Sequence, residues 1–432
     1  MAIVLEHKER TRNKRIEKAS LPKIAYVSLT QHLGKPCDKI LVDVGKQVLR
    51  GELIATSDSK VFSPIHAPIS GKVISIEEYS HPTIGKSLTV VIENDGQDTP
   101  IKEFTKKPEQ EVKKLTVSAI REMVFKAGVV GLGGACFPTH IKLSPLKPLD
   151  TLIINIAECE PYLTADSQLV IEKIQEIILG IELVRRCVGA KRVYLAMEES
   201  NSEVIKVVKN ATQNTDLKIC ILEARYPQGG EKQLIKSILG IEVPRGKIPP
   251  DVGVSVQNVS TVYAIYEAVY LEKPLYERVI TVTGPIVQNP KNLLARIGTP
   301  IRELIDCCLP LVEDPAQIIM GGPMMGFAQY TDNVPTVKAT NGIILFGKKD
   351  IPTITETACI RCGCCIKECS MQLMPCLIAQ AVEKDNYDEA QRCAVMDCIE
   401  CGLCSFVCPA KRNIIPLVRK AKAKIIAKSK KQ

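Results

Sequence analysis

The feature that most constrains this chain is a cysteine motif that occurs twice near its C-terminus. Cys359-x-x-Cys362-x-x-Cys365-x-x-x-Cys369 is followed by Cys398-x-x-Cys401-x-x-Cys404-x-x-x-Cys408-Pro409, an internal repeat with an offset of 39 residues. Of the 18 cysteines, 11 lie within this segment. A secreted disulfide scaffold spreads its cysteines through a small chain, whereas this chain has 432 residues and opens with charged residues instead of the apolar run of a signal peptide. The motif therefore predicts thiol ligands in a reducing cytoplasm.

The spacing of the motif predicts which metal centre these thiols hold. Three thiolates at two-residue gaps surround one face of a cubane, and the fourth cysteine of each motif usually ligates the other cluster. Two [4Fe-4S] clusters are therefore expected, with crossed ligand sets: Cys359, Cys362, Cys365 and Cys408 for one, and Cys398, Cys401, Cys404 and Cys369 for the other. Structural zinc is disfavoured because its CxxC pairs are separated by a longer arm. Cys364 is interpreted as a non-ligand, and Cys376 and Cys393 as core residues of intervening helices.

The net charge of +9 is concentrated at one end of the chain. Residues 409–432 contain nine basic residues and no acidic one, so the remainder is balanced. With no Trp and seven Phe, there is little aromatic surface for stacking on bases, and nucleic-acid binding is not expected. The basic end either docks on anionic lipid or an acidic partner, or is a solvated helical end. No apolar run is long enough to span a bilayer, so any membrane association is expected to be peripheral.

Patterns of apolar residues divide the chain into six segments. A charged, loose leader (1–24) precedes short alternating strands punctuated by Gly and Pro (25–104), which predict a barrel-sandwich that resembles lipoyl carrier domains without a modification lysine. Alternating buried strands and helices (115–254) predict an α/β domain with a mostly parallel sheet. Residues 255–271 are expected to be helical and to open a β-rich unit that extends to residue 350. The last two segments are a helical ferredoxin-type domain (355–425) and a basic tail (426–432).

Glycine-rich and acidic loops mark a candidate site in the α/β domain. Residues 128–134 contain four glycines after a helix-like stretch, and such a run lets backbone amides approach a phosphate. Residues 155–161 follow a predicted buried strand, at the edge where open α/β sheets bind ligands. Residues 226–232 repeat this arrangement at the next expected strand end. A packed structural loop is the competing interpretation of the glycine run.

These blocks together closely resemble the C subunit of Rnf-type ion-translocating ferredoxin:NAD oxidoreductases. The resemblance rests on residues 130–143, 155–162, 225–234 and 256–259 and on both cysteine motifs, and the α/β part is more distantly similar to the flavin subunit of complex I. It implies a Rossmann-like FMN/NADH domain and an SLBB β-grasp domain for the third and fourth segments. It also implies non-covalent FMN at Gly131, Gly133, Gly134, Lys142, Asn155, Glu158, Gly229, Gly230 and Asn258. Glu160 and Glu231 are implied on the nicotinamide side, as the catalytic residues.

The resemblance implies an electron-transfer subunit that connects NAD(H), FMN and the two clusters. Its partners are expected to be other subunits of a membrane-bound complex, with ferredoxin as the ultimate electron partner and a peripheral location on the cytoplasmic face of the membrane. Two alternatives stay open. Cys136 stands where the family usually has glycine and crowds the flavin loop with a side chain, which favours a passive relay with a vestigial nucleotide site. A leader without the expected Gly-Gly/His opening favours a soluble flavoenzyme complex.

Overall fold

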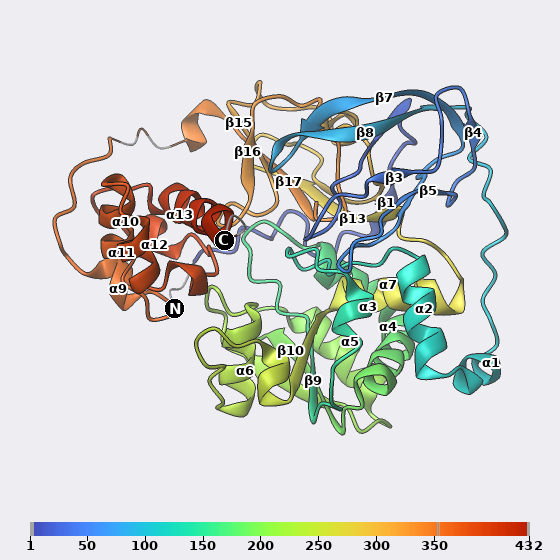
Figure 1. The fold of residues 1–432 in the computed structure, drawn as a ribbon, viewed down its shortest axis with the longest axis horizontal. Helices are drawn as coiled ribbons and strands as arrows, with labels where there is room; N and C mark the ends of the chain where they lie inside the picture. The colour runs from blue at the N-terminus through green and yellow to red at the C-terminus, as the bar shows by residue number, and fades with distance from the viewer. Residues whose placement is uncertain (1–3, 352, 354, 430–432) are drawn as a thin grey trace.

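The computed structural model describes residues 4–351, 353 and 355–429, and Figure 1 shows four regions of distinct architecture. The first is a pair of small antiparallel sheets with strand orders β2-β8-β7-β4 and β3-β5-β6. Alternate side chains of these strands, such as Ala25 and Val27, form one apolar core between the sheets. The strands are β2 (Ile24–Ser28), β3 (Lys39–Ile40), β4 (Gln47–Val48), β5 (Leu53–Thr56), β6 (Ile65–His66), β7 (Gly71–His81) and β8 (Gly85–Asn94).

The second region is a four-stranded sheet of order β11-β10-β9-β12 in which every pairing is parallel. Its strands are β9 (Thr151–Asn155), β10 (Arg192–Glu198), β11 (Lys218–Leu222) and β12 (Val254–Asn258). Its helices are α1 (Glu109–Lys114), α2 (Val117–Lys126), α3 (Thr139–Lys142), α4 (Ala165–Val188), α5 (Ser202–Thr212), α6 (Glu231–Leu239) and α7 (Val259–Tyr270). The prediction of one helix over 255–271 is wrong at its start, because the buried run that ends at Asn258 pairs with β9 as a strand.

The third region is a six-stranded mixed sheet of order β1-β14-β13-β17-β15-β16. It comprises β1 (Ile16–Lys18), β13 (Glu277–Thr283), β14 (Lys291–Arg296), β15 (Gln317–Met320), β16 (Phe327–Gln329), β17 (Gly342–Phe346) and the helix α8 (Ile301–Asp306). The expectation of a loose leader is wrong, because β1 pairs with β14 and Lys8 and Thr11 are buried. Their partners lie more than 100 residues away in sequence, so local composition did not reveal them.

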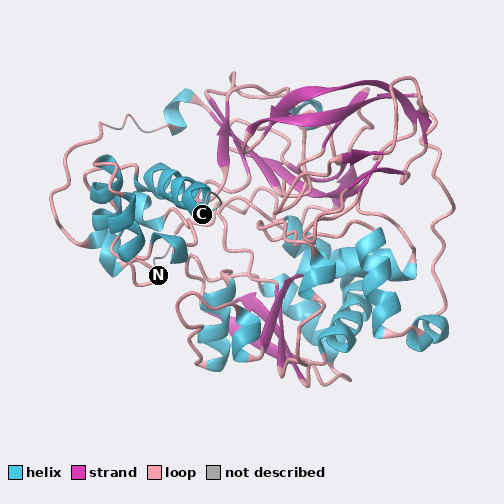
Figure 2. Cartoon of the chain, viewed as in Figure 1, coloured by secondary structure: helices cyan, strands magenta, loops and turns pink. Residues whose placement is uncertain are grey.

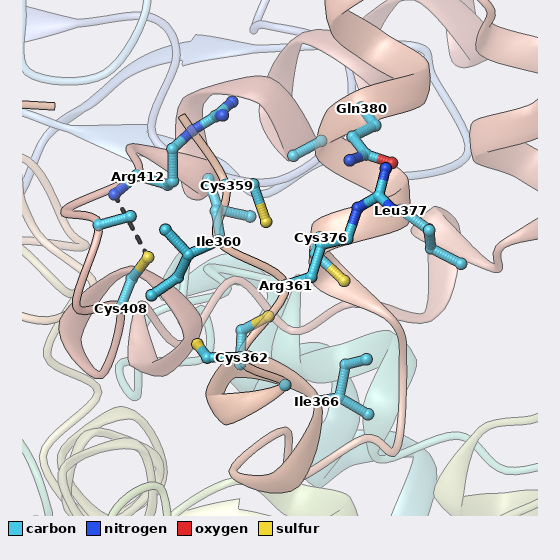
Figure 3. Close-up of a pocket in the computed structure, with 15 residues that line it drawn as sticks. Cys359, Ile360, Arg361, Cys362, Ile366, Cys376, Leu377, Gln380, Cys408 and Arg412 are labelled. Atoms are coloured by element: carbon cyan, nitrogen blue, oxygen red, sulfur yellow. Dashed lines mark hydrogen bonds between the residues drawn. The ribbon is translucent and has the colours of Figure 1, made fainter. Parts of the chain in front are cut away.

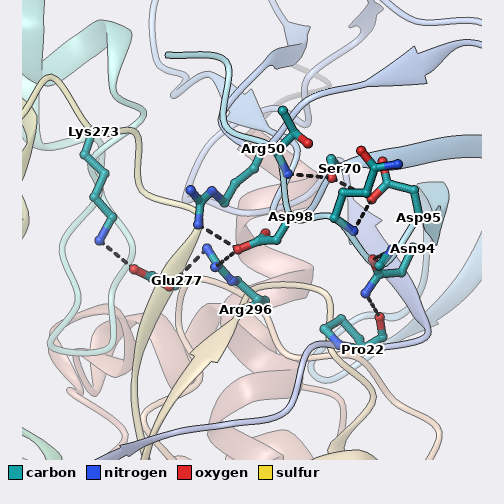
Figure 4. Close-up of polar contacts among 12 residues, drawn as sticks. Pro22, Arg50, Ser70, Asn94, Asp95, Asp98, Lys273, Glu277 and Arg296 are labelled. Carbon is teal, nitrogen blue, oxygen red and sulfur yellow. Dashed lines mark hydrogen bonds and ion pairs between the residues drawn. The ribbon is translucent and has the colours of Figure 1, made fainter. Parts of the chain in front are cut away.

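An ion-pair network fastens the first three regions to one another (Figure 4). Arg50 and Arg296 both bind Asp98, at 2.7 and 2.8 Å. Glu277 forms one ion pair with Arg296 at 3.1 Å and another with Lys273 at 2.6 Å. Burial opposes ionisation of Glu277, but these two cations outweigh burial and hold its pKa below the usual value. Removing one partner of such a network leaves an uncompensated buried charge, so the arrangement between the regions is firmly specified.

The cysteine segment forms the fourth region, which is helical (Figure 2). It contains α9 (Cys364–Lys367), α10 (Pro375–Glu383), α11 (Tyr387–Arg392), α12 (Leu403–Phe406) and α13 (Ile414–Ser429). The basic end of the chain, residues 409–432, belongs largely to α13, where Lys420, Lys422 and Lys428 pair with carboxylates of the same region. Lys430 and Lys431 lie outside the described residues. Within the described ranges, no helix combines the length and the apolar character that crossing a bilayer requires.

Candidate functional site

The glycine-rich loop connects α2 to α3 and is closed by its own backbone. Gly131 N–H donates to the Phe137 carbonyl at 2.9 Å, and Cys136 N–H donates to the Gly131 carbonyl at 3.1 Å. Gly134 has a φ of +117°, and a Cβ added there would meet nothing within 4 Å. Cys136 instead packs into the core of the α/β region, where burial raises the pKa of its thiol to about 11. The Cys136 side chain thus fills the core, and the open side at Gly134 is left clear.

The structure brings most of the predicted flavin residues to the carboxyl edge of the parallel sheet. Asn155 and Asn258 end β9 and β12 and are register partners. A Cβ on Gly133 would lie 3.0 Å from the Asn258 Cβ, which places the glycine loop directly against this edge. Asn155 Nδ2 donates to the Gly229 carbonyl at 2.9 Å. Glycine is required at 229 because a Cβ there would lie 2.6 Å from the Ala157 carbonyl.

Lys142 and Glu231 form an ion pair at the rim of this edge. Lys142 ends α3, and Glu231 begins α6 directly after its N-terminal residue Gly230. Both side chains are partly exposed. A phosphate ligand that reaches this rim could therefore replace Glu231 as the partner of Lys142.

Glu158 is turned toward helix α4 and away from open space. Its carboxylate accepts hydrogen bonds from the backbone of Asp166 and Ser167 at 3.1 Å and from the Ser167 hydroxyl at 2.8 Å. Burial and the neighbouring Asp166 raise its pKa. Asp166 in turn accepts from Asn258 Nδ2 at 2.6 Å, so it fixes a predicted flavin residue. The sequence did not indicate Asp166, because its link to Asn258 spans 92 residues of chain.

Glu160 lies at the junction of three regions. Its carboxylate accepts hydrogen bonds from the amides of Met324 at 3.2 Å and Met325 at 3.0 Å, after β15. The Tyr226 hydroxyl lies 3.3 Å from Glu160 Oε1 and donates to the Cys401 carbonyl at 2.7 Å. Burial raises the pKa of Glu160 to about 7, against these hydrogen bonds, which lower it. Glu160 and Tyr226 thus connect the α/β region to the second cysteine motif, a role the sequence did not indicate.

The cysteine motifs surround two cavities, and each cavity collects one of the predicted crossed sets. Cavity I, of about 410 Å³, is lined by Cys359, Cys362, Cys365 and Cys408 together with Arg361 and Arg412 (Figure 3). Cavity II, of about 20 Å³, is lined by Cys369, Cys398, Cys401 and Cys404 and by apolar side chains that include Leu373 and Ile415. The fourth cysteine of each motif therefore lies in the other motif's cavity. No three His, Cys, Asp or Glu side chains of the described chain are placed to hold a single metal ion.

The chemistry of the lining suits a metal–sulfur centre at each cavity. Four thiols converge from two chain segments in both cases, as the ligands of a cubane do. In cavity II, burial raises the pKa of the Cys404 thiol to about 12 and that of Cys398 to about 11. Thiols in such apolar surroundings keep their protons until a metal displaces them, and they then bind the metal as thiolates.

Three segments of the chain match described families. Residues 3–97 match the RnfC barrel sandwich hybrid domain, 124–267 the Nuo51 FMN-binding domain, and 279–328 the SLBB domain. An NAD+-reducing [NiFe]-hydrogenase in the H2-reduced state shares the fold over 73% of this chain and 64% of its own, with a TM-score of 0.53 and 19% identity. An FMN-binding domain flanked by these modules and followed by a cysteine-rich helical region defines the class of flavin-domain electron-transfer subunits.

Relatives over the whole length identify the family within this class. The chain is 40% identical over 421 residues to the C subunit of the proton-translocating ferredoxin:NAD(+) oxidoreductase complex of Clostridium ljungdahlii, a match that covers 97% of this chain and 92% of the relative. It is 39% identical over 413 residues to the Na(+)-translocating counterpart of Acetobacterium woodii, with 95% and 93% covered. This chain belongs to the family of C subunits of ion-translocating ferredoxin:NAD(+) oxidoreductase complexes. The resemblance noted from the motifs is confirmed, as is the order of barrel-sandwich, FMN-binding and SLBB domains.

Proposed function

We propose that this chain passes electrons between NAD(H), a non-covalent FMN and two [4Fe-4S] clusters, as a subunit of a membrane-bound ion-translocating complex. Ferredoxin is the ultimate electron partner, as the names of the relatives suggest. The observation that carries the proposal is the pair of four-cysteine cavities, of which cavity II abuts the FMN-binding domain through Tyr226 and Cys401.

The edge of the parallel sheet supplies what an FMN needs. Backbone amides of Gly133 and Gly134 would face the phosphate or ring, Gly131 would keep the loop closed through its bond to Phe137, and Lys142 would supply a positive charge to the phosphate. Asn155, Gly229, Gly230 and Asn258 would line the site from the strand ends, with Glu158 holding the start of α4 in place. When bound, FMN supplies the conversion between two-electron and one-electron transfer that the two redox partners require.

The contacts of the cavities suggest an order for the clusters. Tyr226, which binds the Cys401 carbonyl, is three residues from Gly229 of the flavin edge. Cavity II is therefore proposed to hold the inner cluster, next to the flavin domain. Cavity I opens at the exposed Cys362 and is proposed to hold the outer cluster, which exchanges electrons with a partner subunit.

The assignment of Glu160 and Glu231 to the nicotinamide side stays a prediction. Glu231 is exposed enough to meet a ligand. Glu160 already has three hydrogen-bond partners within the protein, which favours a part in domain docking and gives the passive-relay alternative a specific basis. Binding of FMN and its reduction by NADH would distinguish the proposed electron-transfer function from the passive relay.

We propose that partner subunits of the complex attach the chain to the membrane. Four of the five basic side chains on α13, those of Arg419, Lys420, Lys422 and Lys428, already have carboxylate partners, so most of the charge on this described helix is paired within the protein. Such pairing supports peripheral attachment to the complex on the cytoplasmic face. Co-purification with integral subunits from native membranes would support it, whereas co-purification with soluble partners alone would favour a soluble flavoenzyme complex.

Anaerobic reconstitution tests the central proposal. The full chain is loaded with iron and sulfide, then FMN, then NADH, while flavin absorbance and cluster EPR signals are followed. Flavin bleaching followed by cluster signals is expected. Lys142→Met should weaken FMN binding about tenfold, since one phosphate contact of about 1.4 kcal/mol is lost, whereas Lys147→Met, at an exposed position, should not. Failure to bind FMN would establish the relay function; binding without reduction by NADH would overturn the roles of Glu160 and Glu231.

A further inference from the structure

Cavity I contains a cysteine more than a cubane needs. Cys376 lines the cavity beside the four predicted ligands, and Figure 3 shows it among them near Cys359 and Cys362. It lies in the first turn of α10, directly after Pro375. It shares this cavity wall with Cys365, the third cysteine of the first motif. Cys376 packs against the helical core, as predicted, and it also lines the cavity of the predicted ligands.

The repeat provides a comparison site in which this thiol is absent. With the 39-residue offset, Cys376 corresponds to Ile415, and Ile415 lines cavity II. The surrounding positions correspond in the same way: Ala379, Arg412 and Ile414 line cavity I, and their counterparts Val418, Leu373 and Pro375 line cavity II. Packing at this position is therefore satisfied by an aliphatic side chain. The thiol at this position is therefore a chemical difference between the two repeats that packing does not require.

The two other cysteines outside the motif positions do not share this placement. Cys364 and Cys393 are both described, and neither lines cavity I or cavity II. The Cys393 thiol lies 4.0 Å from a carboxylate oxygen of Glu389. Of these three cysteines, Cys376 alone lines a cavity wall.

We propose that Cys376 is a reserve ligand of the centre in cavity I and takes the iron that Cys365 holds when Cys365 releases it. The inference rests on the proposed function, because it requires a [4Fe-4S] cluster in that cavity. The exchange is a substitution without change of oxidation state. The Cys376 thiol loses its proton and forms an iron–sulfur bond, the bond from iron to Cys365 breaks, and the released Cys365 thiolate takes up a proton.

Matched alanine substitutions of equivalent ligands test the proposal. The full chain is reconstituted anaerobically, and iron content and EPR spectra of the reduced protein are measured. Cys365→Ala should keep two clusters, with an altered EPR signal from one, because Cys376 fills the vacated position. The equivalent Cys404→Ala should keep one, and C365A/C376A should also keep one. If Cys365→Ala loses a cluster as Cys404→Ala does, the proposal is overturned. If the unaltered chain fails to bind two clusters, the proposed function fails instead.

Two further experiments keep the proposal testable if Cys365→Ala does not fold. One introduces the extra thiol into cavity II, and the other removes it from cavity I. Ile415→Cys gives cavity II the same reserve thiol, so I415C/C404A should regain the cluster that Cys404→Ala loses. Cys376→Ala alone should keep both clusters but release the iron of one to a chelator several-fold faster, whereas Cys393→Ala should match the unaltered chain. No recovery by I415C/C404A, together with equal release rates for Cys376→Ala and Cys393→Ala, would overturn the proposal.

Discussion

Cavity I and cavity II are formed by the same repeated motif and differ in what surrounds them. Gly363 and Gly402 are equivalent, with φ of +77° and +79°, but a Cβ on Gly363 would meet nothing within 4 Å. A Cβ on Gly402 would lie 2.4 Å from the Met324 carbonyl. The motif therefore determines how the thiols converge, whereas neighbouring domains determine access. One repeat yields an open site and a site sealed against the flavin and SLBB domains.

The largest expected effect is the loss of one whole cluster when a crossed ligand is removed. Cys369→Ala should empty cavity II, and Cys408→Ala should empty cavity I, so each variant should hold about four irons in place of about eight. The cluster that remains identifies the cavity. It should be stripped quickly by a chelator in Cys369→Ala, where the open site survives, and slowly in Cys408→Ala. The reverse order of rates would contradict the crossed ligand sets.

The equivalent glycines offer the next test, on stability. Alanine at either position adopts the left-handed conformation, which costs about 1 kcal/mol. Gly402→Ala also forces its Cβ against a backbone carbonyl, and overpacking adds about 1–3 kcal/mol. Gly402→Ala should therefore lower the free energy of unfolding by about 2–4 kcal/mol and Gly363→Ala by about 1. Denaturant unfolding of the two variants measures this, and equal losses would show that cavity II is not sealed by the SLBB domain.

The pH dependence of the sealed junction is a further prediction. Burial raises the folded pKa of Glu160 from 4.5 to about 7, so the folded state favours its protonated form. The stability contributed by protonation is complete below pH 4.5 and is lost as the pH rises through 7. Relative to Glu160→Gln, the unaltered chain should lose about 2–3 kcal/mol between about pH 5 and pH 8. Glu198, whose pKa burial also raises to about 7, is present in both proteins and cancels. A pH-independent difference would contradict a buried, neutralised Glu160.

Local sequence patterns predicted the thiol sets because cluster ligation depends on short spacings within each motif. The placement of Asn155 and Asn258 could also be predicted from the sequence, because parallel strands bring their carboxyl ends to one edge of a sheet. The contacts of Glu160 could not be predicted in this way, because the amides that bind it are 164 residues or more away in sequence. Cys376 packs against the helical core as predicted, but motif spacing alone does not indicate that it also lines cavity I. The run ending at Asn258 was too short to distinguish a strand from a helix turn by periodicity.

The smallest expected effect concerns charge beside the open cavity. Arg361 lines cavity I, and its equivalent Glu400 is held by Arg419 and Lys422. A unit charge about 10 Å away in water contributes about 0.4 kcal/mol, or about 20 mV for one electron. Arg361→Glu changes the charge by two units and should lower the potential of the outer cluster by about 40 mV, because added negative charge disfavours reduction. EPR-monitored redox titration at low salt measures the shift, and high salt should remove most of it. A shift that persists in high salt would mean that cavity I is shielded from solvent, and the contrast between the two cavities would then rest on lining residues alone.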